Sequence, residues 1–116
     1  MLSLAPLLAF GLTSAAGCAS RDCKENALFG LRVSIVDAEG RPVCDATVTA
    51  RDHDFMEVLR AFPADTPCRY AGAVERKGTY SITAAQGAAA ATVSDVKVTA
   101  DRCHVRPADV SLQLNR

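Results

Sequence analysis

The sequence predicts an all-β protein, a seven-stranded antiparallel sandwich that follows an N-terminal export segment. Apolar residues alternate with polar ones in short runs, and clusters of Gly, Pro and Asp separate these runs. No stretch shows convincing helical periodicity. A length of 116 residues, 49% hydrophobic and 22% charged, suits one small globular unit. Aromatic residues make up only 5%, so the core is small, and five cysteines can supply the covalent support that it needs.

The first segment has the layout of an export signal. Residues 1–12 are apolar and too few to span a bilayer as a helix, and small residues continue to Gly17. No charged side chain precedes Arg21. We therefore expect residues 1–17 to be a signal peptide, and a buried N-terminal strand or helix is the alternative.

Two cleavage patterns follow this apolar run. Ser14-Ala15-Ala16 fits the small-x-small rule of ordinary secretion, whereas Ala15-Ala16-Gly17-Cys18 resembles a bacterial lipobox. In a lipobox the cysteine receives a diacylglycerol, becomes the first mature residue and anchors the protein. Lipidation of Cys18 leaves an even number of cysteines for disulfides, which favours a lipoprotein. Ala19 then implies sorting to the outer membrane, and a soluble secreted or periplasmic protein is the alternative.

The mature chain begins with a polar tether, residues 18–27, and the β domain covers residues 28–116. The first strand is expected around Leu31–Ile35, where apolar and polar residues alternate. Residues 37–42 are rich in turn formers. Gly40 can adopt a positive φ, and Pro42 prevents the turn from continuing as a helix.

The remaining strands are predicted from the same alternation of apolar and polar residues. A second strand is expected over residues 43–50, with Ala46, Val48 and Ala50 on one face. Residues 55–60 alternate weakly, so a strand and a single helical turn both remain open, and the prolines of residues 61–69 predict a loop. Further strands are expected over residues 70–74, 79–84, 88–99 and 110–114, the second of them with Tyr80, Ile82 and Ala84 together.

Two motifs resemble a known family. They are Asp37-x-x-Gly40-x-Pro42-x-x-x-Ala46-x-Val48 and Gly78-x-Tyr80-x-Ile82-x-Ala84. Over residues 28–114 the chain resembles the carboxypeptidase regulatory-like domain, a transthyretin-like Greek-key sandwich. The resemblance implies a non-catalytic domain, but a fold by itself does not assign a ligand.

Four cysteines allow three pairings. If successive strands alternate in direction, Cys44 and Cys68 lie at one end of the domain, and Cys23 and Cys103 lie at the other. This topology favours the disulfides Cys44–Cys68 and Cys23–Cys103, although one extra strand crossing would reverse the assignment.

For other residues with reactive side chains, a structural role explains their pattern better than a catalytic or metal site does. The sequence contains no C-x-x-C pair, and adjacent Cys103 and His104 would point to opposite faces of a strand, so we expect no metal site and no cofactor. Asp52-His53-Asp54 predicts a solvated loop, and no hydrolase, metalloprotease or P-loop motif is present. Thirteen basic and thirteen acidic residues balance, which gives no electrostatic case for nucleic acid.

A set of hydroxyl side chains occupies the expected outward strand positions: Thr47, Thr49, Thr79, Ser81, Thr83, Thr92, Ser94, Thr99 and Ser111. Such a face could bind carbohydrate if an exposed aromatic side chain lay beside it, but solubility of the sheet also explains the pattern. The sequence therefore predicts a non-catalytic cell-envelope lipoprotein, held on the membrane by Cys18, that acts as a structural or protein-interaction module. The alternative is a carbohydrate- or small-ligand-binding module of the same fold.

Overall fold

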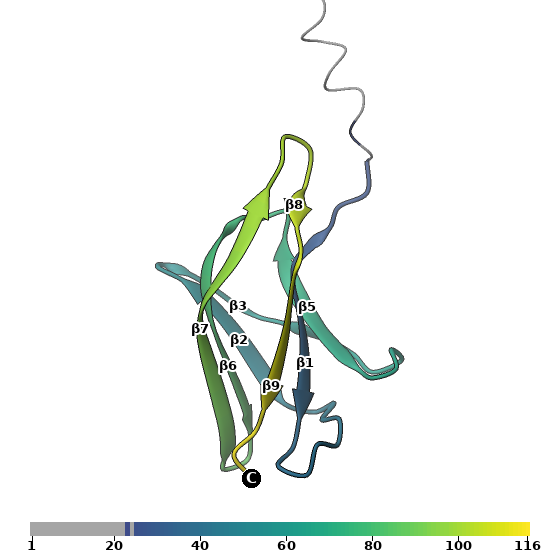
Figure 1. Ribbon diagram of the computed structural model, residues 1–116, viewed down its shortest axis with the longest axis vertical. Coiled ribbons are helices and arrows are strands. Elements are labelled where there is room, and N and C mark those ends of the chain that lie inside the picture. The colour runs from purple at the N-terminus through teal and green to yellow at the C-terminus, as the bar shows by residue number, and fades with distance from the viewer. Residues whose placement is uncertain (1–22, 24) are drawn as a thin grey trace, which may run out of the picture.

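The computed structural model describes Cys23 and residues 25–116, and it contains only strands in this part of the chain (Figure 1). The predicted signal peptide and Cys18 lie outside the described residues. In chain order the strands are β1 (Phe29–Val36), β2 (Thr47–Asp52), β3 (Phe55–Val58), β4 (Arg60–Phe62), β5 (Arg69–Val74), β6 (Gly78–Gln86), β7 (Ala89–Ala100), β8 (Val105–Arg106) and β9 (Ala108–Gln113).

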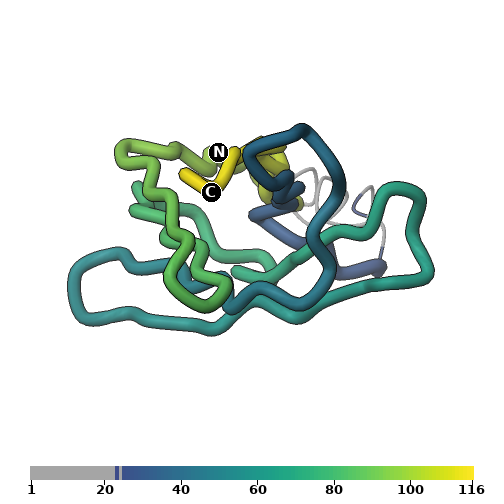
Figure 2. Tube along the Cα trace, turned by 90° about the horizontal axis from the view of Figure 1, so that it is seen from below, coloured from purple at the N-terminus to yellow at the C-terminus, as the bar shows by residue number. Residues whose placement is uncertain are grey.

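The strands form two sheets that share one hydrophobic core. One sheet has the order β4-β5-β1-β9 and the other has the order β3-β2-β6-β7-β8. Seen along the molecule, the backbone of the two sheets surrounds the core (Figure 2). The core cluster takes its buried side chains from both sheets, and each sheet therefore covers the apolar face of the other. The predicted all-β class is confirmed.

The inward positions follow the alternation in the sequence. Leu31, Val33 and Ile35 on β1 are at most 1% exposed, as the period-two pattern predicts. The same holds on β2 and β6, whose fully buried positions are Val48, Ala50, Tyr80, Ile82 and Ala84. Most of these side chains are small or β-branched.

Two extended segments pass from one sheet to the other. β3 and β4 are separated only by Leu59, which is 4% exposed and donates its amide hydrogen to the Val48 carbonyl at 2.7 Å. β8 and β9 are separated only by Pro107, which has no amide hydrogen to contribute to a sheet. These two corners join the sheets along both sides of the core.

The expectation of seven antiparallel strands is wrong in two respects. There are nine strands, because the two corner segments each contribute one strand to each sheet. In addition, β9 pairs with β1 in parallel, with Leu31 opposite Ala108 and Ile35 opposite Leu112. The chain returns to the first sheet at the end where β1 begins, so both strands run in the same direction (Figure 1). The intervening residues provide the long connection that a parallel pair requires.

Smaller corrections concern strand boundaries. The weakly alternating segment after residue 54 is a strand and not a helical turn, and the strand β4 occupies the start of the expected 61–69 loop. The second strand begins at Thr47 and not at Val43. Val43 instead donates its amide hydrogen to the Ile35 carbonyl at 2.9 Å, and Pro42 forms a bridge with Val36.

The first motif builds the turn after β1. An Asp37 carboxylate oxygen accepts hydrogen bonds from the amides of Glu39 and Arg41, both at 2.9 Å. Gly40 has a φ of 87°, the left-handed conformation expected of it. These bonds hold the pKa of Asp37 below its usual value, and the amide of Arg41 has the largest effect.

Tyr70 of β5 fastens the segment after this turn to the four-stranded sheet. Its buried hydroxyl donates to the Val43 carbonyl at 2.8 Å and accepts from the Ala46 amide at 3.0 Å. Ala46 of the first motif is thus positioned by a hydrogen bond to β5 as well as by packing. Burial raises the pKa of Tyr70, which keeps the phenol neutral and able to donate.

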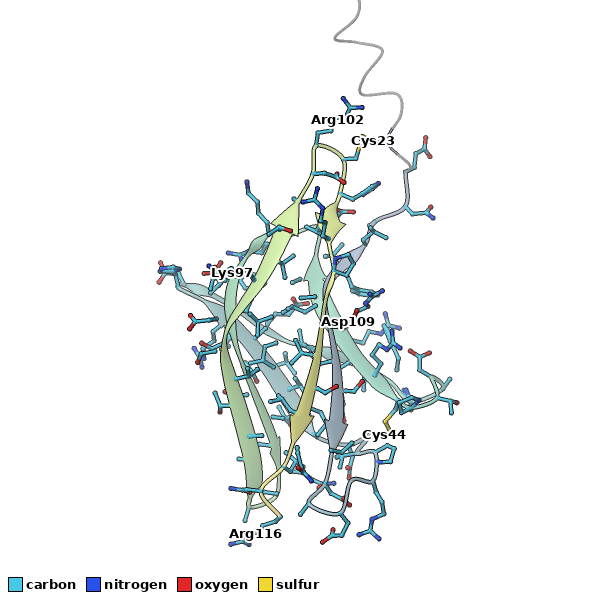
Figure 3. The ribbon with its side chains drawn as sticks, in the orientation of Figure 1. Cys23, Cys44, Lys97, Arg102, Asp109 and Arg116 are labelled. Carbon is cyan, nitrogen blue, oxygen red and sulfur yellow. A yellow bond between two sulfur atoms is a disulfide. The ribbon has the colours of Figure 1, made fainter. Side chains whose placement is uncertain are left out.

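The two disulfides close opposite ends of the domain. Cys23 pairs with Cys103, with Cα atoms 5.2 Å apart, and Cys44 pairs with Cys68, with Cα atoms 5.8 Å apart. These are the pairings that the strand count favours. Figure 3 shows Cys23 at one end of the molecule and Cys44 near the other. The bridges therefore support the small core from both ends.

Removal of either disulfide is expected to destabilise the domain, and the longer loop should matter more. The bridged residues are 80 and 24 positions apart, which corresponds to about 4.5 and about 3.5 kcal/mol in the chain-entropy model. The free energy of unfolding measured in urea should therefore be highest for the wild type, lower for C44S/C68S and lowest for C23S/C103S. The reverse order would contradict the long-loop constraint.

Candidate functional site

The end of the domain that holds Cys23 and Cys103 is organised around Glu75. This residue follows β5 with a φ of 48°. Its carboxylate accepts hydrogen bonds from the Leu28 amide at 2.9 Å, from the Val105 amide at 3.0 Å and from His104 Nδ1 at 2.6 Å. One side chain thus ties together the start of β1, the end of β5 and β8, which are distant in the sequence.

A second carboxylate shapes the loop that carries Cys103. Asp101 Oδ1 accepts hydrogen bonds from the amides of Cys103 at 2.8 Å and His104 at 2.9 Å. The Asp101 amide donates to the His104 carbonyl at 3.0 Å. The loop therefore presents the Cys103 sulfur to Cys23 through defined backbone contacts.

Both carboxyl groups have a pKa below the usual value. For Glu75 the amide of Val105 has the largest effect, followed by the hydrogen bond from His104. For Asp101 the amide of His104 has the largest effect, followed by that of Cys103. Each of these bonds favours the ionised form, so both groups carry negative charge at neutral pH while donors surround them.

We call Glu75 and the three groups that bond to it, from Leu28, His104 and Val105, the Glu75 clamp. An open groove of about 480 Å³ lies beside it. Its lining includes Glu25, Glu75, Lys77, Asp101 and His104. The His104 side chain is only 21% exposed and contacts Glu75. The groove lining offers no free thiol or hydroxyl, since Cys103 is disulfide-bonded. Among the described lining residues, the histidine–carboxylate pair therefore has no thiol or hydroxyl to activate.

A second groove, of about 500 Å³, adjoins the first and shares Lys77 and Ala100 with it. It lies over β6 and β7. Its charged lining residues are Lys77 and Lys97, and its hydroxyl-bearing ones are Thr79 and Thr99. This groove therefore brings positive charge and hydroxyl groups together without a carboxylate in its lining.

The acidic turn predicted from Asp52-His53-Asp54 connects β2 and β3. His53 adopts a φ of 56°, its side chain is 93% exposed, and its Nδ1 lies 2.8 Å from Asp52 Oδ1. Asp52 also accepts a hydrogen bond from Arg76 Nη1 at 3.0 Å. The turn is solvated as expected, while Asp52 itself points back toward the domain.

Arg76 and Gly78 explain why this turn packs as it does. The Arg76 guanidinium lies 3.9 Å from the Phe55 ring centroid and donates to the Tyr80 hydroxyl at 3.0 Å. A Cβ atom at Gly78 would overlap an oxygen of Asp52, so the glycine allows this carboxylate to approach. The second motif thus contributes close packing through Gly78 and a buried anchor through Tyr80.

The outer face of the five-stranded sheet contains most of the predicted hydroxyl side chains. Direct pairing places Val58, Thr49, Thr83 and Thr92 in one row across four strands. Neighbouring rows on the same face contain Met56, Arg51 and Ser81, and then Thr47, Ala85 and Ala90. Arg51 is the one charged residue of these ten. Ser111 does not belong to this face because it lies on β9 in the other sheet.

The aromatic side chains lie elsewhere. Tyr70 and Tyr80 are each 1% exposed, and Phe55 packs against Tyr80 with ring centroids 6.1 Å apart. Phe29 and Phe62 contact each other on the four-stranded sheet, at 5.6 Å between centroids. In the described part of the chain, the rows of hydroxyl groups thus have no aromatic neighbour on their face.

Sequence reasoning alone does not identify Glu75 and Arg76 as organising residues. The sequence shows them only as charged residues before a turn. The partners of Glu75 and the Asp52 partner of Arg76 lie more than twenty positions away. Over Cys23 and residues 25–116, no cluster of His, Cys, Asp and Glu is arranged to hold a metal ion. No helix in the same part of the chain is long and apolar enough to cross a bilayer.

The Glu75 clamp makes a pH-dependent contribution to stability. Its folded-state pKa lies below the usual 4.5, so the unfolded state binds more protons between the two values and stability rises with pH there. We expect Glu75→Gln to destabilise the domain at pH 7, and the difference from the wild type to shrink as the pH falls below about 4.5. Thermal unfolding at stepped pH measures this difference.

Asp54→Asn is the control, because it changes the same kind of group in the exposed turn. Its unfolding temperature should follow that of the wild type at every pH. A Glu75→Gln deficit that stayed constant down to the acid limit would show that the ionised carboxylate does not provide the stabilisation.

Comparison with protein-family models, with curated proteins and with solved structures yields no match for this sequence. The similarity to carboxypeptidase regulatory-like domains therefore remains an expectation from the two motifs. The residues of those motifs have defined places in this fold, from the Asp37 turn to the buried Tyr80.

Proposed function

We propose that this protein is an exported bacterial lipoprotein whose β domain is a non-catalytic interaction module of the cell envelope. In this proposal Cys18 carries the lipid, and the domain is a transthyretin-like Greek-key sandwich of the carboxypeptidase regulatory-like type. The two disulfides support export, because such bonds persist in oxidising compartments and are rare in the cytosol.

The arrangement of the cysteines supports lipidation of Cys18. The two bridges use Cys23, Cys44, Cys68 and Cys103, and Cys18 is the remaining cysteine of the sequence. An unmodified thiol in an oxidising compartment is open to oxidation and to mixed disulfides. A thioether-linked lipid removes this reactivity and supplies the anchor.

The observation that carries the interaction role is the outer face of the five-stranded sheet. Met56 is 54% exposed and Val58 is 59% exposed, and both lie on the edge strand β3 beside the threonine row. Exposed apolar side chains on a charge-poor surface mark sites of protein contact. The unpaired edge of β3 offers backbone donors and acceptors next to them.

Carbohydrate binding by the same face is the second candidate, and the aromatic side chains disfavour it. Sugar sites generally use an exposed ring as a platform. The tyrosines are buried in the core, and Phe55 contacts Arg76 and Tyr80 on the inner side of β3. A protein partner therefore suits Met56, Val58 and the hydroxyl rows better than a sugar does.

The lipid anchor is tested by labelling. Cells given a radiolabelled fatty acid should incorporate it into the wild-type protein and not into Cys18→Ser, because the acceptor thiol is absent. The control is C23S/C103S, which removes a disulfide but keeps Cys18 and should be labelled normally. An unlabelled wild-type protein would contradict the anchor.

The interaction face is tested by crosslinking in intact cells. A photoreactive residue at Thr83 should give a defined protein adduct, and Val58→Asp should abolish it by placing a charge in the contact. Val74→Asp is the matched control, since Val74 is 51% exposed but lies on the other sheet. Both substitutions should leave the unfolding temperature near that of the wild type, as is usual for surface positions. Equal loss of the adduct in both variants would contradict the assignment of the face.

A further inference from the structure

We propose that the groove lined by Lys77, Thr79, Lys97 and Thr99 binds the phosphate groups of anionic phospholipids. The disulfide-closed end of the domain would then rest on the membrane surface. This inference depends on the proposed lipid anchor at Cys18, because the anchor keeps this end close to a bilayer. We name these four residues the lysine groove.

The sheet geometry places the four side chains on one face. A β-bulge at Asp95, with a φ of 60°, shifts the pairing of β6 with β7, and the pairing resumes at Tyr80 opposite Val96. Lys97 therefore lies directly opposite Thr79. Thr99, two positions further along β7, points to the same side as Lys97. All four residues are exposed, and the groove between them measures about 500 Å³.

Neither lysine of the groove has a partner among the residues that the structure describes. Some arginines are paired with carboxylates, as Arg32 is with Asp109 at 2.8 Å and Arg76 is with Asp52 at 3.0 Å. Lys77 and Lys97 have no ion pair or hydrogen bond in the described part of the chain. The sequence has only three lysines, so two of them lie in this groove. An ammonium group with neighbouring hydroxyl donors provides the chemistry that binds phosphate oxygens.

Two carboxylates of the neighbouring groove, Glu75 and Asp101, are engaged in hydrogen bonds within the protein. Glu75 accepts hydrogen bonds from Leu28, His104 and Val105, and Asp101 accepts two from its own loop. Both belong to the lining of the neighbouring groove and not to that of the lysine groove. Arg106 adds a further positive charge, since it lies opposite Thr99 on β8. The lysine groove thus presents cations outward, while these acids bind the protein itself.

The position of the proposed anchor favours a lipid bilayer as the partner of the lysine groove. Cys18 precedes Cys23 by five positions, which limits their separation to about 17 Å. Cys23 is bonded to Cys103, whose groove adjoins the lysine groove through Lys77 and Ala100. Figure 3 shows Lys97 in the half of the molecule that contains Cys23, while Arg116 lies at the opposite end. A tether this short keeps the lysine groove at a high effective concentration of headgroups.

Lysine footprinting of the anchored protein tests the inference. The lipidated full-length mature protein is placed in vesicles of phosphatidylcholine alone or of phosphatidylcholine mixed with phosphatidylglycerol, and is treated with a water-soluble amine-acylating reagent. Mass spectrometry then gives the acylation rates of Lys77 and Lys97. We expect both rates to be about fivefold lower in the anionic vesicles, the effect of a lysine near an anionic surface, and high salt to remove the difference.

Two controls make the footprint specific. Lys77→Gln should weaken the protection of Lys97, whereas Arg51→Gln, on the same sheet face but outside the groove, should not. Inorganic phosphate added to the neutral vesicles should not reproduce the protection. If it does, the groove binds a free anion and the membrane assignment is wrong.

The same samples separate this inference from the proposed function. The mass of the N-terminal peptide reports whether Cys18 carries lipid. Lipid on Cys18 with equal lysine acylation in both kinds of vesicle would overturn the lysine groove alone. Absence of lipid from Cys18 would overturn the anchor and the inference together.

Discussion

The structure depends on closing two sheets around a core of small side chains. Most inward positions are Val, Ile, Leu or Ala, with Tyr70 and Tyr80 as the largest fully buried residues. Such a core buries little surface, and a small domain gains correspondingly little from it. The chain compensates by passing between the sheets at Leu59 and Pro107, so that both sides of the core are bounded by continuous backbone. The disulfides then secure the two ends.

This arrangement separates the surfaces that the proposed function uses. The Cys23–Cys103 bridge and the Glu75 clamp fix the point where the N-terminal segment meets the domain. The lysine groove lies beside that point, and the row containing Val58 and Thr83 extends over the outer face of the same five-stranded sheet. In the proposed function, a rigid attachment therefore orients one end toward the proposed lipid anchor and leaves the broad sheet face accessible. A flexible tether joined to an unbridged domain would provide no such orientation.

Local patterns were sufficient for several features of the fold. The alternation in β1, β2 and β6 identified the inward residues correctly, because a strand places successive side chains on opposite faces whatever its partners are. The Asp37 turn was also predictable, since Asp, Gly and Pro favour it through their own backbone and side-chain preferences. The disulfide pairing followed from a strand count, although the two corner segments were not foreseen. The predicted pairing is correct because Cys44 and Cys68 still lie at the same end of the domain.

The sequence by itself determined the all-β class, the inward residues and the turn after β1, since these depend on neighbours a few positions apart. Only the tertiary structure decided the parallel pairing of β9 with β1, the partners of Glu75 and the approach of Asp52 to Gly78. It also brought Lys77 and Lys97 into one groove. These features join residues that are far apart along the chain. Their contacts depend on where each strand enters its sheet, which no local pattern of side chains encodes.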